Sequence, residues 1–159
     1  MHKVKPNQQR VIRTGGFTLV EILLAIGLVG VLAALAFSNY QAYVERARVY
    51  QAVTDIAAIF TGIQLYFQDA REYPASLAII GAVAQLDPWG RPYEYLNLTT
   101  RNGNGGARRD KKLNPLNSDF DLYSRGKDGL TRVPITQKDS QDDVLRANDG
   151  AFIDLASKY

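Results

Sequence analysis

The order of polar and apolar positions divides the chain into a polar start, one long apolar run and a mixed remainder. Residues 1–16 are polar and carry four basic side chains and no acid: Lys3, Lys5, Arg10 and Arg13. Residues 17–37 carry Glu21 as their only charge, and the next charge is Glu45. A helix needs about 20 mostly apolar residues to cross a bilayer. The run 17–37 is therefore predicted to be a transmembrane helix.

Helical spacing continues beyond this run. Side chains that recur every three or four residues would share one face: Tyr43, Ala47, Tyr50, Thr54, Val53, Ala57, Phe60 and Gln64. No proline occurs between Pro6 and Pro74, so we expect one helix from Phe17 to about Gln68. An amphipathic helix buries its apolar face. The Tyr and Phe side chains of this stretch are therefore predicted to contact the core of a folded domain.

The rest of the chain alternates turn signals with short runs typical of strands. Turns are expected at Tyr73-Pro74 and over Asp87–Pro92, and strands over 93–98, 120–124 and 151–155. A long helix followed by a small antiparallel sheet predicts an α+β fold. The predicted domains are a leader, 1–16, a membrane or filament-core helix, 17–37, its amphipathic continuation, 38–72, and a β-rich globular domain, 73–159.

The basic start orients the predicted span. Basic residues before a span favour a cytoplasmic N-terminus, so the domain after it would lie on the outer side. A secretory signal is the competing interpretation, because it has the same basic start and apolar core. The apolar run is longer than a usual signal core, and no A-x-A-like sequence follows Phe37. Gly15-Gly16 instead precedes the run, and cleavage there would leave the helix on the mature protein.

The string Gly16-Phe17-Thr18-Leu19-Val20-Glu21, between a basic leader and an apolar helix, resembles the type IV prepilin signature. The resemblance implies cleavage after Gly16 by a membrane aspartic prepilin peptidase and N-methylation of Phe17. It also implies that Glu21 meets the N-terminal amine of Phe17 in a neighbouring subunit, which would set the register of a filament. A charge inside hydrocarbon is tolerable when it is paired. The alternative is that Glu21 reaches the lipid headgroups.

A second resemblance covers the soluble half. Its motifs are Asp87-Pro88-Trp89-Gly90, Pro92-Tyr93, Tyr95, Asp121-Leu122-Tyr123-Ser124 and Gly126-Lys127-Asp128-Gly129, and they resemble the major pseudopilin of type II secretion. The chain has no cysteine, so it cannot form the disulfide that usually closes the C-terminal region of major type IV pilins. It departs from many members in one place, since Ser38 stands where they have a helix-kinking proline.

This resemblance implies a pilin-like fold and a structural role. The chain would be a non-enzymatic subunit of a helical filament, made in the bacterial inner membrane and extracted into a periplasmic or surface fibre. The implied partners are copies of itself, minor pseudopilins, the inner-membrane assembly platform with its ATPase, and the prepilin peptidase. Two alternatives stay open: a surface type IV pilin for adhesion, motility or DNA uptake, and a membrane-anchored binding domain that does not polymerise.

The resemblance also implies calcium in place of the disulfide. Hard oxygen ligands for calcium are available late in the chain: Asp128, Asp142, Asp143, Asn148 and Asp149. Their spacing is not that of an EF-hand, because the chain has no D-x-[DN]-x-[DN]-G run. The alternative is that these residues are solvated turn acids. Only Asp128 matches a family position, the one after Gly126-Lys127.

Charge and composition narrow the remaining function classes. The formal charge of +3 first suggests an anionic partner. Removing the four basic residues of the leader from 19 leaves 15 against 16 acids, so the mature charge becomes −1 and no nucleic-acid partner is expected. The basic segment 101–112 is interpreted as a solvated loop. The only histidine, His2, leaves with the leader, so the mature chain has neither His nor Cys for acid–base or nucleophilic catalysis.

Overall fold

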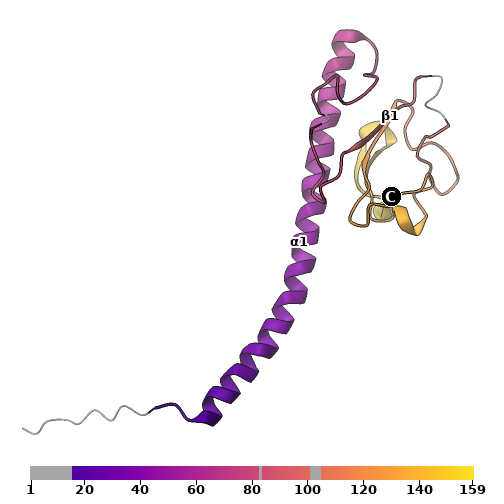
Figure 1. Ribbon diagram of the computed structural model, residues 1–159. Coiled ribbons are helices and arrows are strands. Elements are labelled where there is room, and N and C mark those ends of the chain that lie inside the picture. Colours follow the sequence, from indigo (N-terminus) through magenta and orange to yellow (C-terminus); the bar gives the residue numbers. More distant parts are fainter. Residues whose placement is uncertain (1–15, 83, 101–104) are drawn as a thin grey trace, which may run out of the picture. The chain divides into compact units, whose positions relative to one another are not determined.

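A computed structural model describes residues 16–82, 84–100 and 105–159 (Figure 1). It contains one long helix, α1 (Leu19–Ala70), and four strands: β1 (Glu94–Asn97), β2 (Phe120–Ser124), β3 (Val144–Ala147) and β4 (Phe152–Leu155). Three short 3₁₀ turns lie at Lys138–Ser140, Asn148–Gly150 and Ala156–Lys158. One helix followed by an antiparallel sheet confirms the predicted α+β, pilin-like fold. The chain divides into two compact units, residues 1–41 and 42–159, and α1 belongs to both.

The helix begins and ends close to the predicted bounds. Its first internal hydrogen bond runs from the Ile22 amide to the Thr18 carbonyl, and it continues through Ser38 without interruption. It ends where Arg71 adopts a left-handed φ of 62°, three residues before Pro74. The first part of α1 is long and apolar enough to cross a membrane by length and composition, and none of that stretch is buried.

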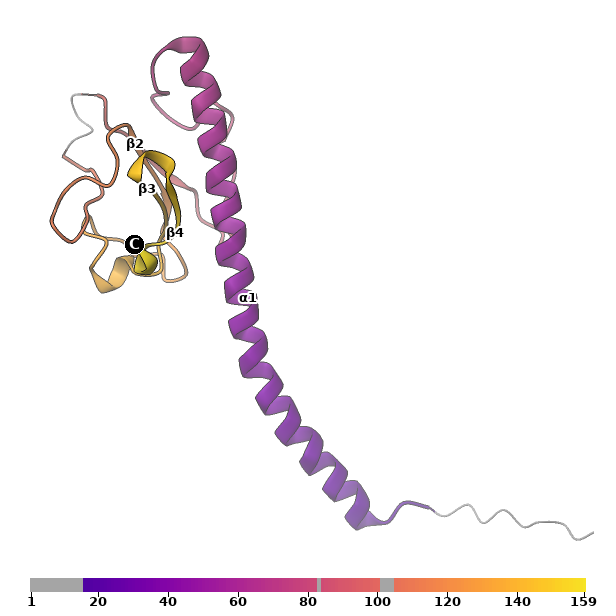
Figure 2. The same cartoon turned by 180° about the vertical axis from the view of Figure 1, so that it is seen from behind.

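The four strands form one antiparallel sheet in the order β1-β2-β3-β4 (Figure 2). Tyr95 pairs with Leu122 between β1 and β2, and Arg146 pairs with Ile153 between β3 and β4. The sequence did not predict β3, because its short run is preceded by two aspartates and contains Arg146. All four of its residues are nevertheless buried. Because one of the buried residues is an arginine, the pattern of apolar residues alone does not predict this strand.

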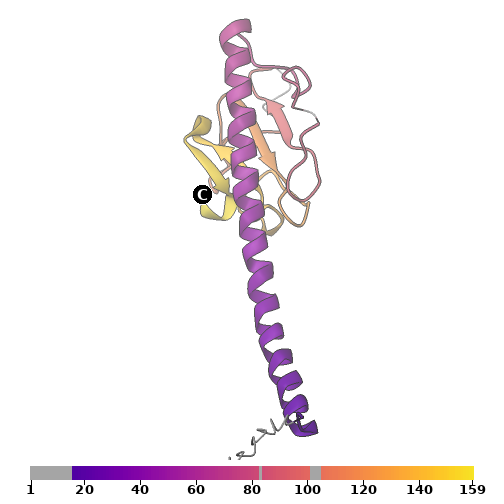
Figure 3. The same ribbon diagram turned by 90° about the vertical axis from the view of Figure 1, so that its left-hand side faces the viewer.

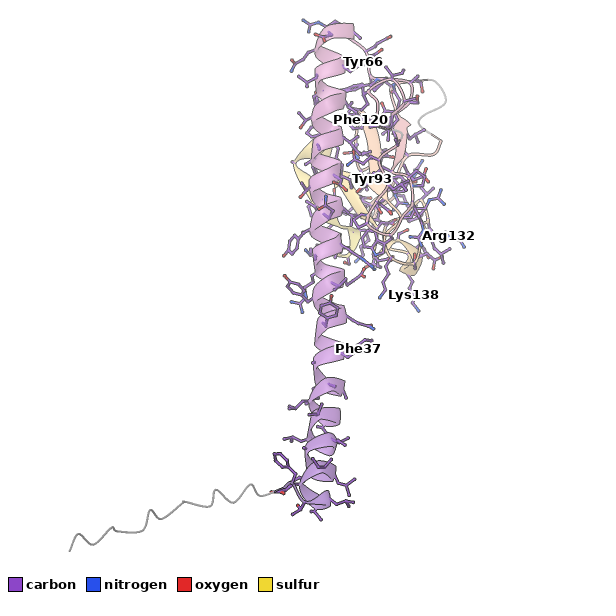
Figure 4. All side chains as sticks on the ribbon, turned by 60° about the vertical axis from the view of Figure 1, so that its left-hand side comes forward. Phe37, Tyr66, Tyr93, Phe120, Arg132 and Lys138 are labelled. Carbon is purple, nitrogen blue, oxygen red and sulfur yellow. The ribbon has the colours of Figure 1, made fainter. Side chains whose placement is uncertain are left out.

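The core of the second unit lies between α1 and one face of the sheet (Figure 3). The helix contributes a stripe of small and branched residues: Ala52, Ile56, Ile59 and Ile63. The sheet contributes Phe120, Leu122 and Val144. Figure 4 labels Tyr93 and Phe120, which both belong to this cluster. The spacing of four, three and four along α1 places the helical set on one face.

The prediction that the helical aromatic residues contact the core is wrong for three of them. Tyr40, Tyr43 and Tyr50 are 65%, 70% and 68% exposed. Phe60 is partly buried and packs on the core, as predicted. The reason is that α1 has apolar residues on two faces, and the sheet covers the face that carries the isoleucines. Periodicity finds both faces, but it does not tell which one the sheet covers.

Candidate functional site

The predicted processing site lies on exposed chain directly before α1. Gly16 and Phe17 are both exposed and precede the first helical residue, Leu19. A Cβ added to Gly16 would meet no atom within 4 Å. The surroundings within this chain therefore do not require a glycine at this position. Any requirement for it would come from another molecule that recognises the 16–17 peptide bond.

Glu21 takes part in the N-terminal cap of α1. Its Oε2 accepts hydrogen bonds from the Thr18 amide and the Thr18 hydroxyl, both at 2.8 Å, and its own amide donates to Thr18 Oγ1 at 3.2 Å. This reciprocal arrangement is a capping box, which satisfies amides that have no partner in the first helical turn. The sequence pattern T-x-x-E before an apolar run is the signal for a capping box, which was not predicted here.

The cap holds the carboxylate in place but uses only some of its hydrogen-bond acceptor positions. Both bonds from Thr18 go to Oε2, and an ionised carboxylate has about four acceptor positions. Glu21 is therefore held in a defined place at the start of an exposed apolar helix, with Oε1 available to a further donor. The large apolar side chains from Phe17 to Phe37 are all between 46% and 84% exposed. None of the residues that the structure describes covers this surface.

Two of the five predicted calcium ligands lie together. The Asp128 amide donates to Asp142 Oδ2 at 2.9 Å, and Asp128 Oδ1 accepts from the Leu130 amide at 2.7 Å. Gly126 lies against the same segment with a left-handed φ of 60°, and a Cβ there would lie 2.1 Å from the Asp142 carbonyl oxygen. The turn after β2 and the segment before β3 are therefore in close contact around this pair.

Asp143 lies in a different environment from its neighbour. It is fully buried and forms an ion pair with Arg108, whose side chain is also buried. Its Oδ2 accepts from the Thr131 hydroxyl at 2.7 Å, while Oδ1 has no hydrogen-bond partner among the described residues. Burial raises the pKa of Asp143 to about 6, opposed by the Thr131 hydrogen bond and the charge of Arg108. The carboxylate is thus committed to a partner inside the protein.

The last two predicted ligands are also engaged elsewhere. Asp149 accepts from the Ser118 amide at 2.7 Å and from its hydroxyl at 2.8 Å. Asn148 Oδ1 accepts from the Tyr159 hydroxyl at 2.7 Å. Across residues 16–82, 84–100 and 105–159, no three His, Cys, Asp or Glu side chains gather to hold a metal. The five residues do not converge, so the geometry fits at most a site around Asp128 and Asp142.

The Asp87–Pro92 turn is tied to α1 and to the loop after β2. Asp87 Oδ1 accepts from the amides of Trp89 and Arg91 at 3.0 and 2.8 Å, and Oδ2 accepts from the Ser124 hydroxyl at 2.6 Å. Trp89 Nε1 donates to Glu45 of α1 at 3.1 Å. Arg91 donates to the Gly126 carbonyl at 2.7 Å. The sequence predicted the turn but not its contacts with Ser124, Glu45 and Gly126.

The basic segment 101–112 falls partly outside the described residues, which omit 101–104. Of the rest, Arg108 is not solvated as predicted, because it pairs with the buried Asp143. Asp110 accepts from the amides of Lys112 and Asn114 at 2.7 and 2.8 Å and so closes a tight turn. The ion pair with Asp143 and the hydrogen bonds of Asp110 hold this part of the segment in place.

Comparison with known proteins found 26 matching curated sequences. The type II secretion system core protein G of Dickeya chrysanthemi is 31% identical over 142 residues, which cover 87% of this chain and 89% of that protein. That of Pseudomonas aeruginosa is 30% identical over 135 residues, 72% of this chain and 84% of the relative. A fimbrial protein of Neisseria meningitidis is 25% identical over 147 residues, 89% and 84% of the two chains. No family model and no solved structure matched.

Proposed function

This chain belongs to the type II secretion core protein G family, the major pseudopilins, and from that premise we propose that it is a structural subunit of a helical filament that supports protein secretion. The observation that carries the proposal is the apolar run 17–37, of which no part is buried and which precedes a folded α+β unit in the chain. Such a surface needs cover from outside the chain. Lipid would supply it before assembly, and other subunits would supply it in the filament.

The proposed life of the subunit begins in the bacterial inner membrane. The basic leader stays in the cytoplasm and residues 42–159 lie on the periplasmic side. A prepilin peptidase cuts after Gly16, and Phe17 becomes the methylated N-terminal residue. The exposure of the 16–17 bond, directly before a capped helix, supports this step. Assembly then needs an inner-membrane platform, an ATPase and minor pseudopilins, and the subunit itself has a structural and not a catalytic role.

Glu21 has a defined part in the proposed assembly. The Thr18 cap holds its carboxylate through Oε2, which leaves Oε1 for the amine of Phe17 in a neighbouring copy. An ion pair in a low-dielectric surrounding is strong only if both charges are present. Each incoming subunit would therefore be drawn to one register, in which its amine or its carboxylate meets the opposite charge.

Replacement of Glu21 tests this role. In cells that make the filament, Glu21→Ala should leave membrane insertion intact and abolish filaments sheared from the cell surface or seen by electron microscopy. Glu72→Ala removes the same charge beyond the end of α1 and should leave the filament yield unchanged. Normal filaments from Glu21→Ala would contradict the assembly role. Complete absence of filaments from the unmodified chain would contradict the proposed function itself.

A second candidate function rests on the similarity to the fimbrial protein. A surface type IV pilin would use the same processing and the same helix, but its filaments would extend from the cell as long fibres. Deletion of the gene separates the two functions. Loss of secreted proteins from the medium supports the secretion filament, and loss of motility or adhesion with secretion unchanged supports the surface pilus.

Calcium binding is proposed only around Asp128 and Asp142. The support is that their two segments touch and that carboxylate and backbone oxygens are the ligands that calcium prefers. Adding calcium to the full chain in detergent should raise the thermal midpoint of unfolding, and EDTA should reverse the increase. Asp142→Asn should remove the response, while Asp154→Asn, a control in β4, should keep it. An identical midpoint with calcium and with EDTA would contradict this proposal.

A further inference from the structure

A groove lies beside α1 shortly after its apolar run, within the unit formed by residues 42–159. It encloses about 410 Å³ between the helix and residues 155–158. Sites that bind small molecules usually enclose about 300–1,000 Å³, so this volume suffices for part of a ligand of that size. The apolar walls of the groove are Ala42, Val49, Tyr50 and Leu155. Val49 and Leu155 also pack on the core cluster, so the folded domain holds these walls in place.

Three charged side chains form the rim of the groove, and one of them has no ion-pair partner among the described residues. Glu45 forms an ion pair with Arg48 at 3.8 Å. Lys158 Nζ donates to both carboxylate oxygens of Asp154, at 2.8 and 2.7 Å. Arg46 is exposed, and no described acid forms an ion pair with it. The rim and its partners comprise three basic and two acidic side chains, which leaves a net charge of +1.

Counting along α1 places the first residues of the groove near the headgroups of a bilayer that holds the apolar run. Residues 19–37 form about 29 Å of helix at 1.5 Å per residue, which matches a hydrocarbon core of about 30 Å. Ala42 and Arg46 follow Phe37 by five and nine residues, or about 8 and 14 Å of helix. Long side chains on a helix point toward its N-terminus. The guanidinium of Arg46 is therefore directed back toward the bilayer.

The exposed side chains of α1 beside the groove are of the kinds that favour a membrane interface. Tyr43 and Tyr50 are 70% and 68% exposed, and Arg46 and Arg48 lie between them in the sequence. Tyrosine is enriched at the level of the headgroups because its ring is apolar and its hydroxyl is polar. These two arginines are the basic residues of α1, whereas the two charges of residues 51–70 are acidic. The basic residues thus gather at the end of this stretch that follows the apolar run, where anionic headgroups attract them.

We propose that this groove binds one anionic phospholipid of the adjacent leaflet, with its phosphate at Arg46 and Lys158. A guanidinium donates two parallel hydrogen bonds to a phosphate, and Lys158 keeps one of its three N–H groups after pairing with Asp154. The apolar walls exclude water, which strengthens a contact between charges. The net charge of +1 favours a lipid with a net negative charge over a zwitterionic one. The proposal rests on membrane insertion of residues 17–37, which the proposed function includes, and it does not require a filament.

Lipid retention by the purified full-length chain tests the charge of the site. The chain is reconstituted in nanodiscs made of equal parts of phosphatidylglycerol and phosphatidylcholine, and native mass spectrometry identifies the lipids that stay bound when it is released. The unmodified chain should retain phosphatidylglycerol several-fold more often than phosphatidylcholine. Arg46→Gln should lower this retention several-fold. Arg71→Gln, which replaces an exposed arginine one residue beyond α1, should not. Equal retention of the two lipids, or equal retention by both variants, would overturn the proposal.

A matched pair of larger side chains tests the groove separately from its charge. Ala42 and Ala47 are both exposed residues of α1, and only Ala42 lines the groove. Ala42→Trp fills the groove while Arg46 stays in place, so it should lower phosphatidylglycerol retention several-fold. Ala47→Trp adds the same side chain outside the groove and should leave retention unchanged. Both variants should keep the thermal midpoint of the unmodified chain in detergent, which excludes a folding defect. Full retention by Ala42→Trp would overturn the groove as the binding site.

The outcomes separate this proposal from the proposed function. A chain that enters nanodiscs and retains no phosphatidylglycerol would overturn the lipid site and leave the proposed function standing. A second copy of the chain retained in place of the lipid would overturn the site as well, because another protein surface would then occupy the groove. Failure of the unmodified chain to enter nanodiscs would contradict the membrane stage of the proposed function itself.

Discussion

Residues 17–41 and residues 42–159 bury apolar side chains in opposite ways. The described residues of the first region form no core, and the large apolar side chains from Phe17 to Phe37 are all exposed. The second closes a core in which α1, β2 and β3 supply residues that are fully buried, such as Ile56, Phe120 and Val144. Both regions share α1, so secondary structure does not explain the difference. What differs is whether the chain itself supplies the covering surface.

This difference indicates how stability and assembly are divided along the chain. Folding free energy comes from area removed from water within the molecule, and residues 17–41 contribute little of it. Their apolar area remains available for lipid or for other subunits. Changes in the first region should therefore affect assembly, and changes in the second should affect the free energy of unfolding. The following substitutions test that division.

The largest expected effect on stability comes from the buried ion pair. Arg108→Met keeps most of the side-chain volume but leaves Asp143 buried without its charged partner. Removing one partner of such a pair typically lowers the free energy of unfolding by about 3–5 kcal/mol. Denaturant unfolding of the full chain in detergent measures it. The adjacent control Arg109→Met, which removes an exposed side-chain hydrogen bond to the Leu113 carbonyl, should have a much smaller effect. Equal effects would show that the pair is unimportant.

A smaller effect is expected from the same truncation made in each region. Ile56 is 0% exposed and Ile26 is 65% exposed. Ile56→Ala should lower the free energy of unfolding by about 2–5 kcal/mol, because it removes buried methyl groups and leaves a cavity. Ile26→Ala should leave it unchanged, since its side chain is outside any core of the chain. The same denaturant titration measures both. A loss of stability from Ile26→Ala would break the comparison between the two regions.

The smallest effect on the free energy of unfolding is expected at the hydrogen bond between Trp89 and Glu45. Trp89→Phe removes the indole N–H that donates to Glu45 and should lower the free energy of unfolding by about 0.5–1.5 kcal/mol, the usual net value of one hydrogen bond. Glu45→Gln and the double variant complete a double-mutant cycle. A coupling energy of zero would mean that this contact does not fasten the turn to α1.

The sequence by itself determined the features that depend on neighbouring residues. The apolar run 17–37, the absence of proline up to Pro74 and the T-x-x-E pattern at Thr18 specify α1 and its beginning. The strands β1, β2 and β4 and the turn at Asp87 also follow from local pattern. Helical hydrogen bonds, caps and turns form between residues close in sequence, so the local sequence contains the signal for each of them, including the capping box at Thr18 that was not predicted.

Only the tertiary structure decided which residues are covered and by what. Arg108 and Asp143 are 35 positions apart, and neither looks like a core residue until the other is beside it. The sequence did not predict β3 for the same reason. Arg146 can be buried there because it forms an ion pair with Asp119, which is distant in sequence. Which of the two apolar faces of α1 is buried depends on the position of the sheet. The sheet covers the isoleucines and leaves Tyr43 and Tyr50 exposed. Burial requires two surfaces in contact, and the pattern of residues along one segment describes only the surface of that segment.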